Sequence, residues 1–231
     1  MRIHVTGATG YLGSELVRRC PDASTRRVEV RDEDAVRALL KRVRPDVVIH
    51  TAYRQDGPDA LEINVLGSET VARAAAAVAA RLVHLSTDVV FDGRKGAPYV
   101  ESDSPGPVTE YGRTKAEAEQ RVAAAHPRAL LVRTSLLYGG AEPSKHELAA
   151  RKRELTFYTD EIRCPVHVGD LAAALLELAA LDVSARCTSQ APTRSRVRSS
   201  RSGSPAGRWR RPRLRRGVRS TARWTRRARR R

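Results

Sequence analysis

Ile3-His4-Val5-Thr6-Gly7-Ala8-Thr9-Gly10-Tyr11-Leu12-Gly13 stands almost at the start of the chain and is followed at once by Ser14-Glu15-Leu16-Val17. An apolar run, a Gly-x-x-Gly-x-x-Gly turn and a stretch of helix formers together predict a strand-loop-helix unit. Glycines let such a turn approach a ligand closely, and the free N–H groups at the helix start attract a pyrophosphate. A glycine pattern between a strand and a helix is far more specific than an isolated one. The stretch predicts a dinucleotide-binding domain, with a glycine-rich turn of another α/β protein as the alternative.

Strands alternate with helices along the rest of the first 181 residues. This order predicts a parallel sheet covered on both faces, which is a doubly wound Rossmann fold of the α/β class. One strand of the usual set is missing: either Arg27–Val30 is the second strand and the third is lost, or the second is deleted. The expected strands are 1–5, 27–30, 47–50, 82–86, 129–133 and 165–168, and the helices after the first are 32–43, 58–80, 112–125 and 170–181.

The charge of the chain is concentrated at its C-terminal end. The formal net charge is +17, yet residues 186–231 hold 18 arginines and no acidic residue, whereas residues 1–185 hold 25 basic and 26 acidic residues. Apolar residues in 186–231 follow neither the helix nor the strand period, so we expect a disordered basic tail. The tail is either an arm that binds nucleic acid or an anionic surface, or the product of a shifted reading frame. Its abrupt start favours the shifted frame.

Cysteine usage and hydropathy indicate a cytoplasmic protein. Cys20, Cys164 and Cys187 have no metal-ligand spacing and form no even framework, which fits a reducing compartment. The N-terminus enters a strand directly instead of a signal peptide. The most apolar helical stretch, 71–82, is too short to span a bilayer and contains arginine. We therefore expect no contact with a membrane.

Tyr111-Gly112-Arg113-Thr114-Lys115 places a phenol and an ammonium group four residues apart at a helix start. Residues at this spacing share a helix face, and a nearby cation lowers the pKa of a tyrosine, which makes the phenol a proton donor near neutral pH. Upstream, Leu85-Ser86-Thr87-Asp88 ends a predicted strand, where open α/β sheets bind ligands. Tyr-x-x-x-Lys alone is common, but its combination with the glycine turn predicts a catalytic site.

These motifs resemble the extended short-chain dehydrogenase/reductase superfamily and, within it, the dTDP-4-dehydrorhamnose reductase group. The resemblance covers most of residues 1–181 and none of the tail. Its most group-specific part is Ser-Thr-Asp-x-Val-Phe-Asp-Gly, and the other parts are shared across the superfamily. The stretches that carry the resemblance are Thr6–Gly13, Pro45–Ala52, Leu85–Gly93, Tyr111–Lys115 and Arg163–Ala172.

The resemblance implies the reduction of a 4-keto nucleotide sugar by NADPH or NADH. Thr87 would hydrogen-bond the C4 carbonyl, Tyr111 would protonate the developing alkoxide, and Lys115 would lower the Tyr111 pKa and hold the nicotinamide ribose. Residues 1–185 would then comprise the Rossmann domain and part of a substrate lobe, and a homodimer is compatible with the family. The residues implied to contact the cofactor are Gly7, Gly10, Tyr11, Leu12, Gly13, Asp32, Glu33, Thr51, Ala52, Tyr53, Tyr111 and Lys115.

Other polar residues receive structural interpretations. Glu15 matches an acid that some rhamnose reductases use for Mg²⁺ at a dimer contact, but we interpret it as an exposed helix glutamate and predict no metal site. His50, His84 and His167 lie on or beside predicted strands without a carboxylate or cysteine at ligand spacing. We interpret them as core or sheet histidines with satisfied hydrogen bonds.

Two further functions compete with the reductase. The 4,6-dehydratases of the superfamily carry Asp-Glu after the catalytic threonine, and Val89 in place of that glutamate argues against dehydration. An epimerase needs the same tyrosine and lysine, and some relatives are regulatory subunits that bind nucleotide without turnover. The missing strand and the unpatterned C-terminal segment predict poor turnover by this chain, because substrate positioning supplies a large part of barrier lowering.

Overall fold

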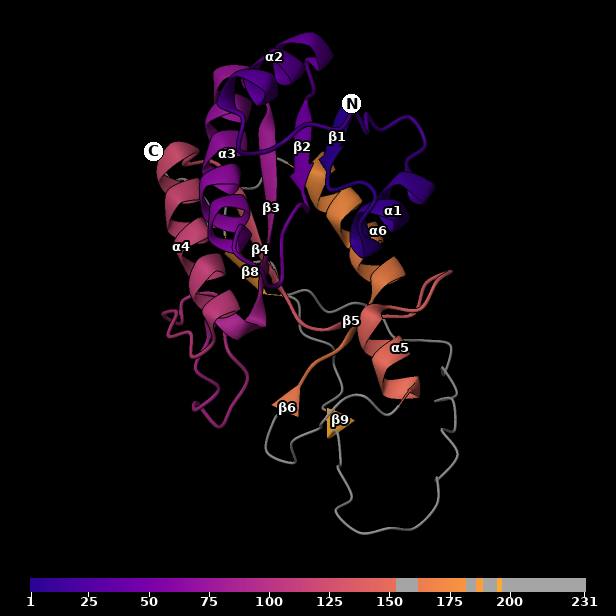
Figure 1. Cartoon of the computed structure of the whole chain (residues 1–231), viewed down its shortest axis with the longest axis vertical. Helices are drawn as coiled ribbons and strands as arrows, with labels where there is room; N and C mark the ends of the chain where they lie inside the picture. The colour runs from indigo at the N-terminus through magenta and orange to yellow at the C-terminus, as the bar shows by residue number, and fades with distance from the viewer. Residues whose placement is uncertain (153–161, 182–185, 189–194, 197–231) are drawn as a thin grey trace, which may run out of the picture. The chain divides into compact units, whose positions relative to one another are not determined.

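The computed structural model describes residues 1–152, 162–181, 186–188 and 195–196. Within these ranges the main sheet has five strands in the order β1-β2-β3-β4-β8, and all neighbouring pairs are parallel. Because the strands are parallel, their carboxyl ends lie at one edge of the sheet (Figure 1). The strands are β1 (Ile3–Thr6), β2 (Val47–His50), β3 (Arg81–Thr87), β4 (Leu130–Thr134) and β8 (Arg186–Thr188).

Helices cover both faces of this sheet, which confirms the predicted doubly wound arrangement. α1 (Tyr11–Arg19) packs beside α6 (Val168–Ala180) on one face. On the other face α2 (Glu33–Val43), α3 (Ser68–Ala77) and α4 (Glu110–Ala125) pack in a row (Figure 1). Among the residues that the structure describes, no helix has both the length and the apolar character needed to cross a membrane.

Local sequence signals determine where the helices begin. The Asp32 carboxylate accepts a hydrogen bond from the Ala35 N–H at 2.9 Å and so caps α2. The Thr109 hydroxyl accepts one from the Gly112 N–H at 3.0 Å and caps α4. Such caps satisfy N–H groups that have no partner inside the helix. α1 differs, because Gly10 at its start provides no capping side chain.

The two faces of the sheet differ in polarity. Toward α1 and α6 the strands present apolar side chains, among them Val5 and Ile49. Toward α3 and α4 the carboxyl halves of the strands present His50, His84 and Arg133, which are almost completely buried. We call these three side chains the buried polar layer. It lies beneath the helix that carries the predicted Tyr-Lys pair.

The connection from α1 to α2 does not contain the strand predicted at 27–30. A single bridge ties this connection to β1: the Ser24 N–H donates to the Ile3 carbonyl at 2.8 Å, and the Ser24 carbonyl accepts from the Val5 N–H at 2.9 Å. Val30 is nevertheless buried, in the apolar cluster beneath α2 and α3. The apolar alternation of this segment therefore reflects burial against helices, and the prediction of a strand is wrong.

Short elements follow the carboxyl edge of the sheet. η1 (Glu62–Gly67) is a π-helical stretch that leads into α3, and η2 (Asp88–Val90) is a 3₁₀ turn directly after β3. β5 (Leu137–Tyr138) pairs in parallel with β7 (Val166–His167), so the strand predicted at 165–168 forms outside the main sheet. The remaining elements are α5 (Lys145–Arg151), β6 (Ile162–Arg163) and β9 (Ser195–Arg196).

β8 and β9 lie inside the segment that the sequence predicts to be disordered. β8 pairs with residues 131–133 of β4, and β9 pairs antiparallel with β6. The prediction of disorder from residue 186 onward is therefore wrong for these two strands. Strands of two or three residues are held by backbone hydrogen bonds and are too short to show a side-chain period. The rest of the predicted tail lies outside the described residues.

Candidate active site

The glycine turn joins β1 to α1 and packs against the end of β2. Gly7 has a φ of +72°, and a Cβ added to it would lie 2.7 Å from the Ala52 backbone nitrogen. A Cβ on Gly13 would collide with the Gly7 carbonyl oxygen. Glycine is therefore required at both positions, because only it allows the helix, the turn and the neighbouring strand end to approach so closely.

The start of α1 suits an anionic group. The first turn contains no acidic residue, and Gly10 offers no side-chain cap to the N–H groups of Tyr11, Leu12 and Gly13. Uncapped N–H groups at a helix start, together with the helix dipole, stabilise negative charge. The residues present therefore fit the pyrophosphate of a dinucleotide.

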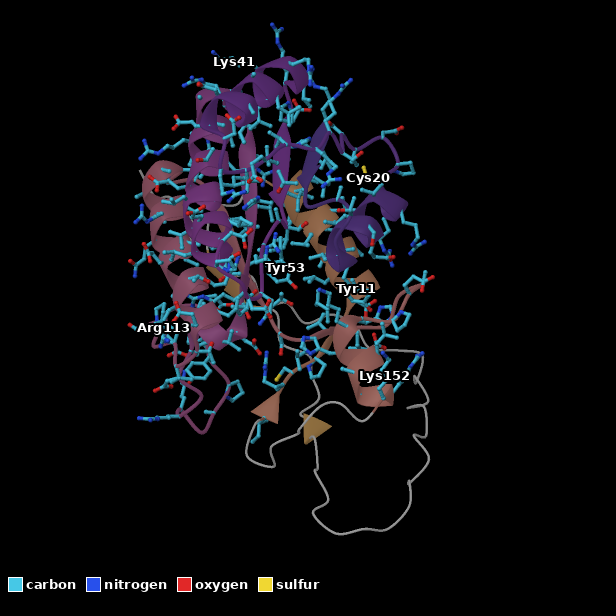
Figure 2. All side chains as sticks on the ribbon, in the orientation of Figure 1. Tyr11, Cys20, Lys41, Tyr53, Arg113 and Lys152 are labelled. Carbon is cyan, nitrogen blue, oxygen red and sulfur yellow. The ribbon has the colours of Figure 1, made fainter. Side chains whose placement is uncertain are left out.

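The residues after β2 continue this surface. The Thr51 hydroxyl donates to the Thr6 carbonyl at 2.7 Å and ties the end of β2 to that of β1. The Tyr53 ring lies 5.9 Å from the Tyr111 ring, measured between centroids. Figure 2 shows Tyr11 and Tyr53 toward the carboxyl edge of the sheet, with Lys41 at the opposite end of the fold. The glycine turn and the end of β2 are thus on the same edge as Tyr111.

Asp32 and Glu33, which the resemblance implies to contact the cofactor, are exposed and interact with neighbouring residues of α2. Asp32 caps α2, as described above, and Glu33 lies 3.9 Å from Arg37 one turn later. An ion pair of 3.1 Å between Arg31 and Glu62 ties the preceding segment to η1. A role for the two acids in cofactor binding stays a prediction.

β3 and α4 carry the three predicted catalytic residues. Thr87 is the last residue of β3, and its hydroxyl donates to the Asp88 carboxylate at 3.3 Å. Lys115 on α4 is buried, and its ammonium group donates to the Leu85 carbonyl of β3 at 2.6 Å. Tyr111 lies one turn before Lys115 and is partly buried. The helix and the strand thereby present all three residues near the carboxyl end of β3.

The pKa of Tyr111 departs from the sequence prediction. Burial raises the pKa of Tyr111 above its usual range, the charges of Tyr53 and Asp88 raise it further, and Arg163 opposes them. The Lys115 ammonium is directed at a main-chain carbonyl of β3, and burial lowers the pKa of Lys115 to about 8. The expected lowering of the Tyr111 pKa by Lys115 is therefore wrong for this structure.

The histidines singled out by the sequence have different surroundings. His50 lies between a threonine hydroxyl of β1 at 2.6 Å and the Ser68 hydroxyl at 3.1 Å, so its hydrogen bonds are satisfied. His84 stacks on His50 with ring centroids 5.3 Å apart, and neither of its nitrogens has a partner among the described residues. His167 accepts from the Gly169 N–H at 3.1 Å at the start of α6. The prediction of satisfied hydrogen bonds is wrong for His84.

Glu15 is buried, which contradicts the prediction of an exposed glutamate. Its carboxylate pairs with Arg18 at 2.6 Å and with Arg19 at 2.8 Å. The hydrogen bonds from Arg18 are the largest cause that lowers the pKa of Glu15 to about 2. The two arginines stand three and four residues later on the same helix, so the helical spacing already indicates that they can cover the carboxylate. Within the described ranges no group of three or more His, Cys, Asp or Glu side chains is placed to hold a metal ion.

The RmlD substrate binding domain matches residues 1–190 of this sequence. The chain belongs to the RmlD substrate-binding-domain family. The match includes the glycine turn, the Thr87 strand end, the Tyr-Lys pair on α4 and β8, so it spans all parts of the candidate site.

Three relatives show how far the similarity of this RmlD family member extends. The dTDP-4-dehydrorhamnose reductase of Mycolicibacterium smegmatis is 38% identical, over 77% of this chain and 60% of the relative. The methionine adenosyltransferase 2 subunit beta of Xenopus laevis is 31% identical, over 77% of this chain and 61% of the relative. The crystal structure of dTDP-4-dehydrorhamnose reductase from Bacillus anthracis in complex with NADP is 28% identical, with a TM-score of 0.75 over 84% of this chain and 76% of that one. The RmlD family member thus spans about three fifths of the two curated relatives.

Two residues that had no role assigned from the sequence lie at the site of this RmlD family member. Asn64 is fully buried in η1. Its side-chain oxygen accepts from the Arg54 N–H at 2.8 Å, and its side-chain nitrogen donates to the Arg54 carbonyl at 2.8 Å and to the Thr114 hydroxyl at 3.1 Å. Arg163 pairs with Asp88. A polar residue on the buried side of a predicted helix could have indicated Asn64. Arg163 stands 75 residues from Asp88, so no local pattern links them.

Proposed function

We propose that this chain reduces a 4-keto nucleotide sugar with NADPH or NADH as the hydride donor. The observation that carries the proposal is the buried hydrogen bond from Lys115 to the Leu85 carbonyl, which fixes α4 against β3 at 2.6 Å. That contact keeps Tyr111 beside the strand end where Thr87 lies. The relative from Bacillus anthracis binds NADP, and the uncapped start of α1 suits a pyrophosphate, so both support a nicotinamide dinucleotide.

The side chains have distinct tasks in this reaction. When bound, the reduced nicotinamide supplies a hydride to the carbonyl carbon of the sugar. Thr87 donates a hydrogen bond to the carbonyl oxygen, and Tyr111 transfers its phenolic proton to that oxygen as negative charge develops on it. A phenol with a raised pKa stays protonated at neutral pH, so the proton is present when it is needed. The Lys115 ammonium binds the hydroxyls of the nicotinamide ribose.

The second candidate is a regulatory protein that binds nucleotide without turnover. The similarity to a methionine adenosyltransferase subunit favours it. In this case residues 1–185 would bind nucleotide at the glycine turn without turnover. An epimerase of the same superfamily would use the same tyrosine and lysine. A shifted reading frame is our proposed explanation of the arginine-rich segment beyond the family match, which ends at residue 190, and translating the coding DNA in the other two frames tests it.

Titration with NADPH and NADH, followed by nicotinamide fluorescence, separates these candidates. It is paired with a turnover assay on dTDP-4-dehydrorhamnose for the unchanged chain and for Tyr111→Phe. For the reductase we expect saturable binding by both proteins and a loss of turnover by about 100-fold or more in the variant, because general acid catalysis is removed. The control is Tyr99→Phe, which removes a hydroxyl bonded to Asp92 at 2.6 Å in a loop after β3.

Each outcome distinguishes one candidate. Equal turnover by Tyr111→Phe and the unchanged chain would refute the catalytic assignment. Saturable binding with no turnover by the unchanged chain would support the regulatory protein, and no binding of either nucleotide would reject both candidates. Release of product with inverted configuration and an unchanged level of NADPH would indicate the epimerase.

A further inference from the structure

Asp88 and Arg163 form an ion pair beside the candidate active site. The guanidinium group of Arg163 donates to both carboxylate oxygens of Asp88, from Nε at 2.9 Å and from Nη2 at 2.7 Å. The Arg163 side chain is 16% exposed and that of Asp88 is 26% exposed, so solvent screens the pair only in part. A two-point contact of this kind fixes orientation as well as charge. It joins η2, directly after β3, to β6 of the later segment.

The same carboxylate also contacts Thr87. The Thr87 hydroxyl donates to Asp88 Oδ1 at 3.3 Å, and Arg163 Nη2 donates to that same oxygen. An oxygen that already accepts a charged donor at 2.7 Å is a weaker acceptor for the hydroxyl. Thr87 is therefore oriented by Asp88 but held loosely enough to turn its proton to a carbonyl oxygen. Without Arg163, the Asp88 carboxylate would accept a stronger hydrogen bond from the Thr87 hydroxyl, which would then be less free to turn.

The ion pair also places balanced charges near Tyr111. The groups that face the phenol are Tyr53 from the loop after β2, Asp88 from η2 and Arg163 from β6, with Lys115 one turn later on the same helix. Asp88 raises the Tyr111 pKa and Arg163 lowers it. Because the two charges are joined in one pair, each largely cancels the effect of the other on the phenol.

We propose that the Asp88–Arg163 ion pair is a positioning device for the reduction proposed above: it orients the Thr87 hydroxyl and balances the charge beside Tyr111. Both are positioning residues, because they act through Thr87 and Tyr111 and not on the substrate. This inference rests on the proposed function for its role in turnover, but its effect on the phenol is a property of the protein alone. The two can therefore be tested separately.

The decisive measurement is the ionisation of Tyr111 in Asp88→Asn and Arg163→Gln. In each background the phenolate absorbance is recorded against pH, and the curve of the matching Tyr111→Phe protein is subtracted, which isolates Tyr111 from the other tyrosines. Asp88→Asn removes a negative charge that raises the Tyr111 pKa, so the phenolate should appear at lower pH than in the unchanged chain. Arg163→Gln leaves Asp88 without its counter-charge, so the phenolate should appear at higher pH. A merely structural role would not move the two variants in opposite directions.

Controls separate charge from geometry. Glu110→Gln and Arg113→Gln make the same changes of charge in an exposed ion pair of 2.8 Å that flanks Tyr111 in the sequence, and we expect no shift from either. Arg163→Lys keeps the charge and loses the two-point contact. It should leave the phenolate transition in place while lowering turnover through a poorly oriented Thr87.

Every outcome decides the proposal. Opposite shifts in Asp88→Asn and Arg163→Gln support it, whether or not the chain turns over a sugar. Shifts of the same sign, no shift in Asp88→Asn or in Arg163→Gln, or equal shifts in the Glu110→Gln and Arg113→Gln controls would overturn it. NADPH binding by the same variants tests the proposed function independently, because neither residue belongs to the glycine turn.

Discussion

Because Gly13 has no side chain, α1 can pack closely against the glycine turn. Gly13 faces the Gly7 carbonyl oxygen so closely that any side chain must push the helix away from β1. The N–H groups that we expect to hold a pyrophosphate would move with the helix. The contact therefore links the stability of the fold to the binding of the cofactor.

Gly13→Ala should lower the free energy of unfolding by roughly 1–3 kcal/mol, as overpacked sites do, and weaken NADPH binding at least tenfold. Urea unfolding and fluorescence titration measure the two effects. Gly106→Ala is the matched control, because its Cβ would meet its nearest neighbour, the Asp92 Cβ, at 3.7 Å, an ordinary contact. Equal behaviour of the two variants would contradict the proposed role of Gly13.

Lys115 loses its charge near physiological pH. Burial lowers its pKa to about 8, so the ammonium form dominates below that pH and the neutral amine above it. If the ammonium holds the ribose, the dissociation constant of NADPH should rise as pH increases through about 8. Lys115→Met should bind more weakly and lose this pH dependence, whereas Lys41→Met, at the opposite end of the fold, should keep it (Figure 2). A pH-independent affinity in the unchanged chain would exclude the charge from the contact.

At the scale of elements, the buried polar layer determines how the sheet responds to acid. Burial lowers the pKa of His50 to about 3 and that of His84 well below its usual value. In the unfolded chain both histidines take up protons near pH 6.5, whereas the folded chain does not. The unfolded state therefore binds more protons as pH falls below that value, and the folded state loses stability.

His84→Leu should make the protein less sensitive to acid. Between pH 7.5 and 5, each such histidine costs the folded chain about 2 kcal/mol, and this variant should recover one such contribution. Urea unfolding at the two pH values measures it. The control is His146→Gln, which changes an exposed histidine of α5 and should leave the acid sensitivity unchanged. A larger loss of stability at low pH in His84→Leu would contradict the assignment.

The sequence predicts elements well where the signal is local. Asp32 identifies the start of α2, and the apolar run at 47–50 identifies β2. Prediction from the sequence fails where the structure of a segment depends on distant parts of the chain. The valines at 28 and 30 alternate as in a strand, but they pack under helices. β8 depends on backbone pairing with β4 and carries no pattern.

At the scale of the whole molecule, the sequence places the parts of the site but not the contacts between them. Chain order and strand ends predict that Thr87, Tyr111 and the glycine turn share one edge. The raised pKa of Tyr111 and the Asp88–Arg163 pair follow from packing between segments that are far apart in the chain. The burial of Tyr111 and the charges around it cannot be predicted from the spacing of residues along one helix.

The extent of the folded unit is itself testable. Residues 1–199 form one compact unit, and β8 lies within it. A chain ending at Ser199 should keep the melting temperature of the full chain. A chain ending at Leu181 loses the partner of residues 131–133 in β4 and should melt several degrees lower, since a loss of about 2 kcal/mol corresponds to roughly 4–8 °C at this size. Equal melting temperatures of the two shortened chains would show that β8 adds no stability.

The bridge at Ser24 has a consequence for the behaviour of the protein in concentrated solution. Without a strand between α1 and α2, the outer edge of β1 could be open to pairing. A strand of another molecule could then add to it, which is the first step of fibre growth. Ser24 occupies the Ile3 carbonyl and the Val5 N–H, the groups with which such an addition would start. Ser24 thus occupies, at the β1 edge, the backbone groups to which a strand of another molecule would first bind.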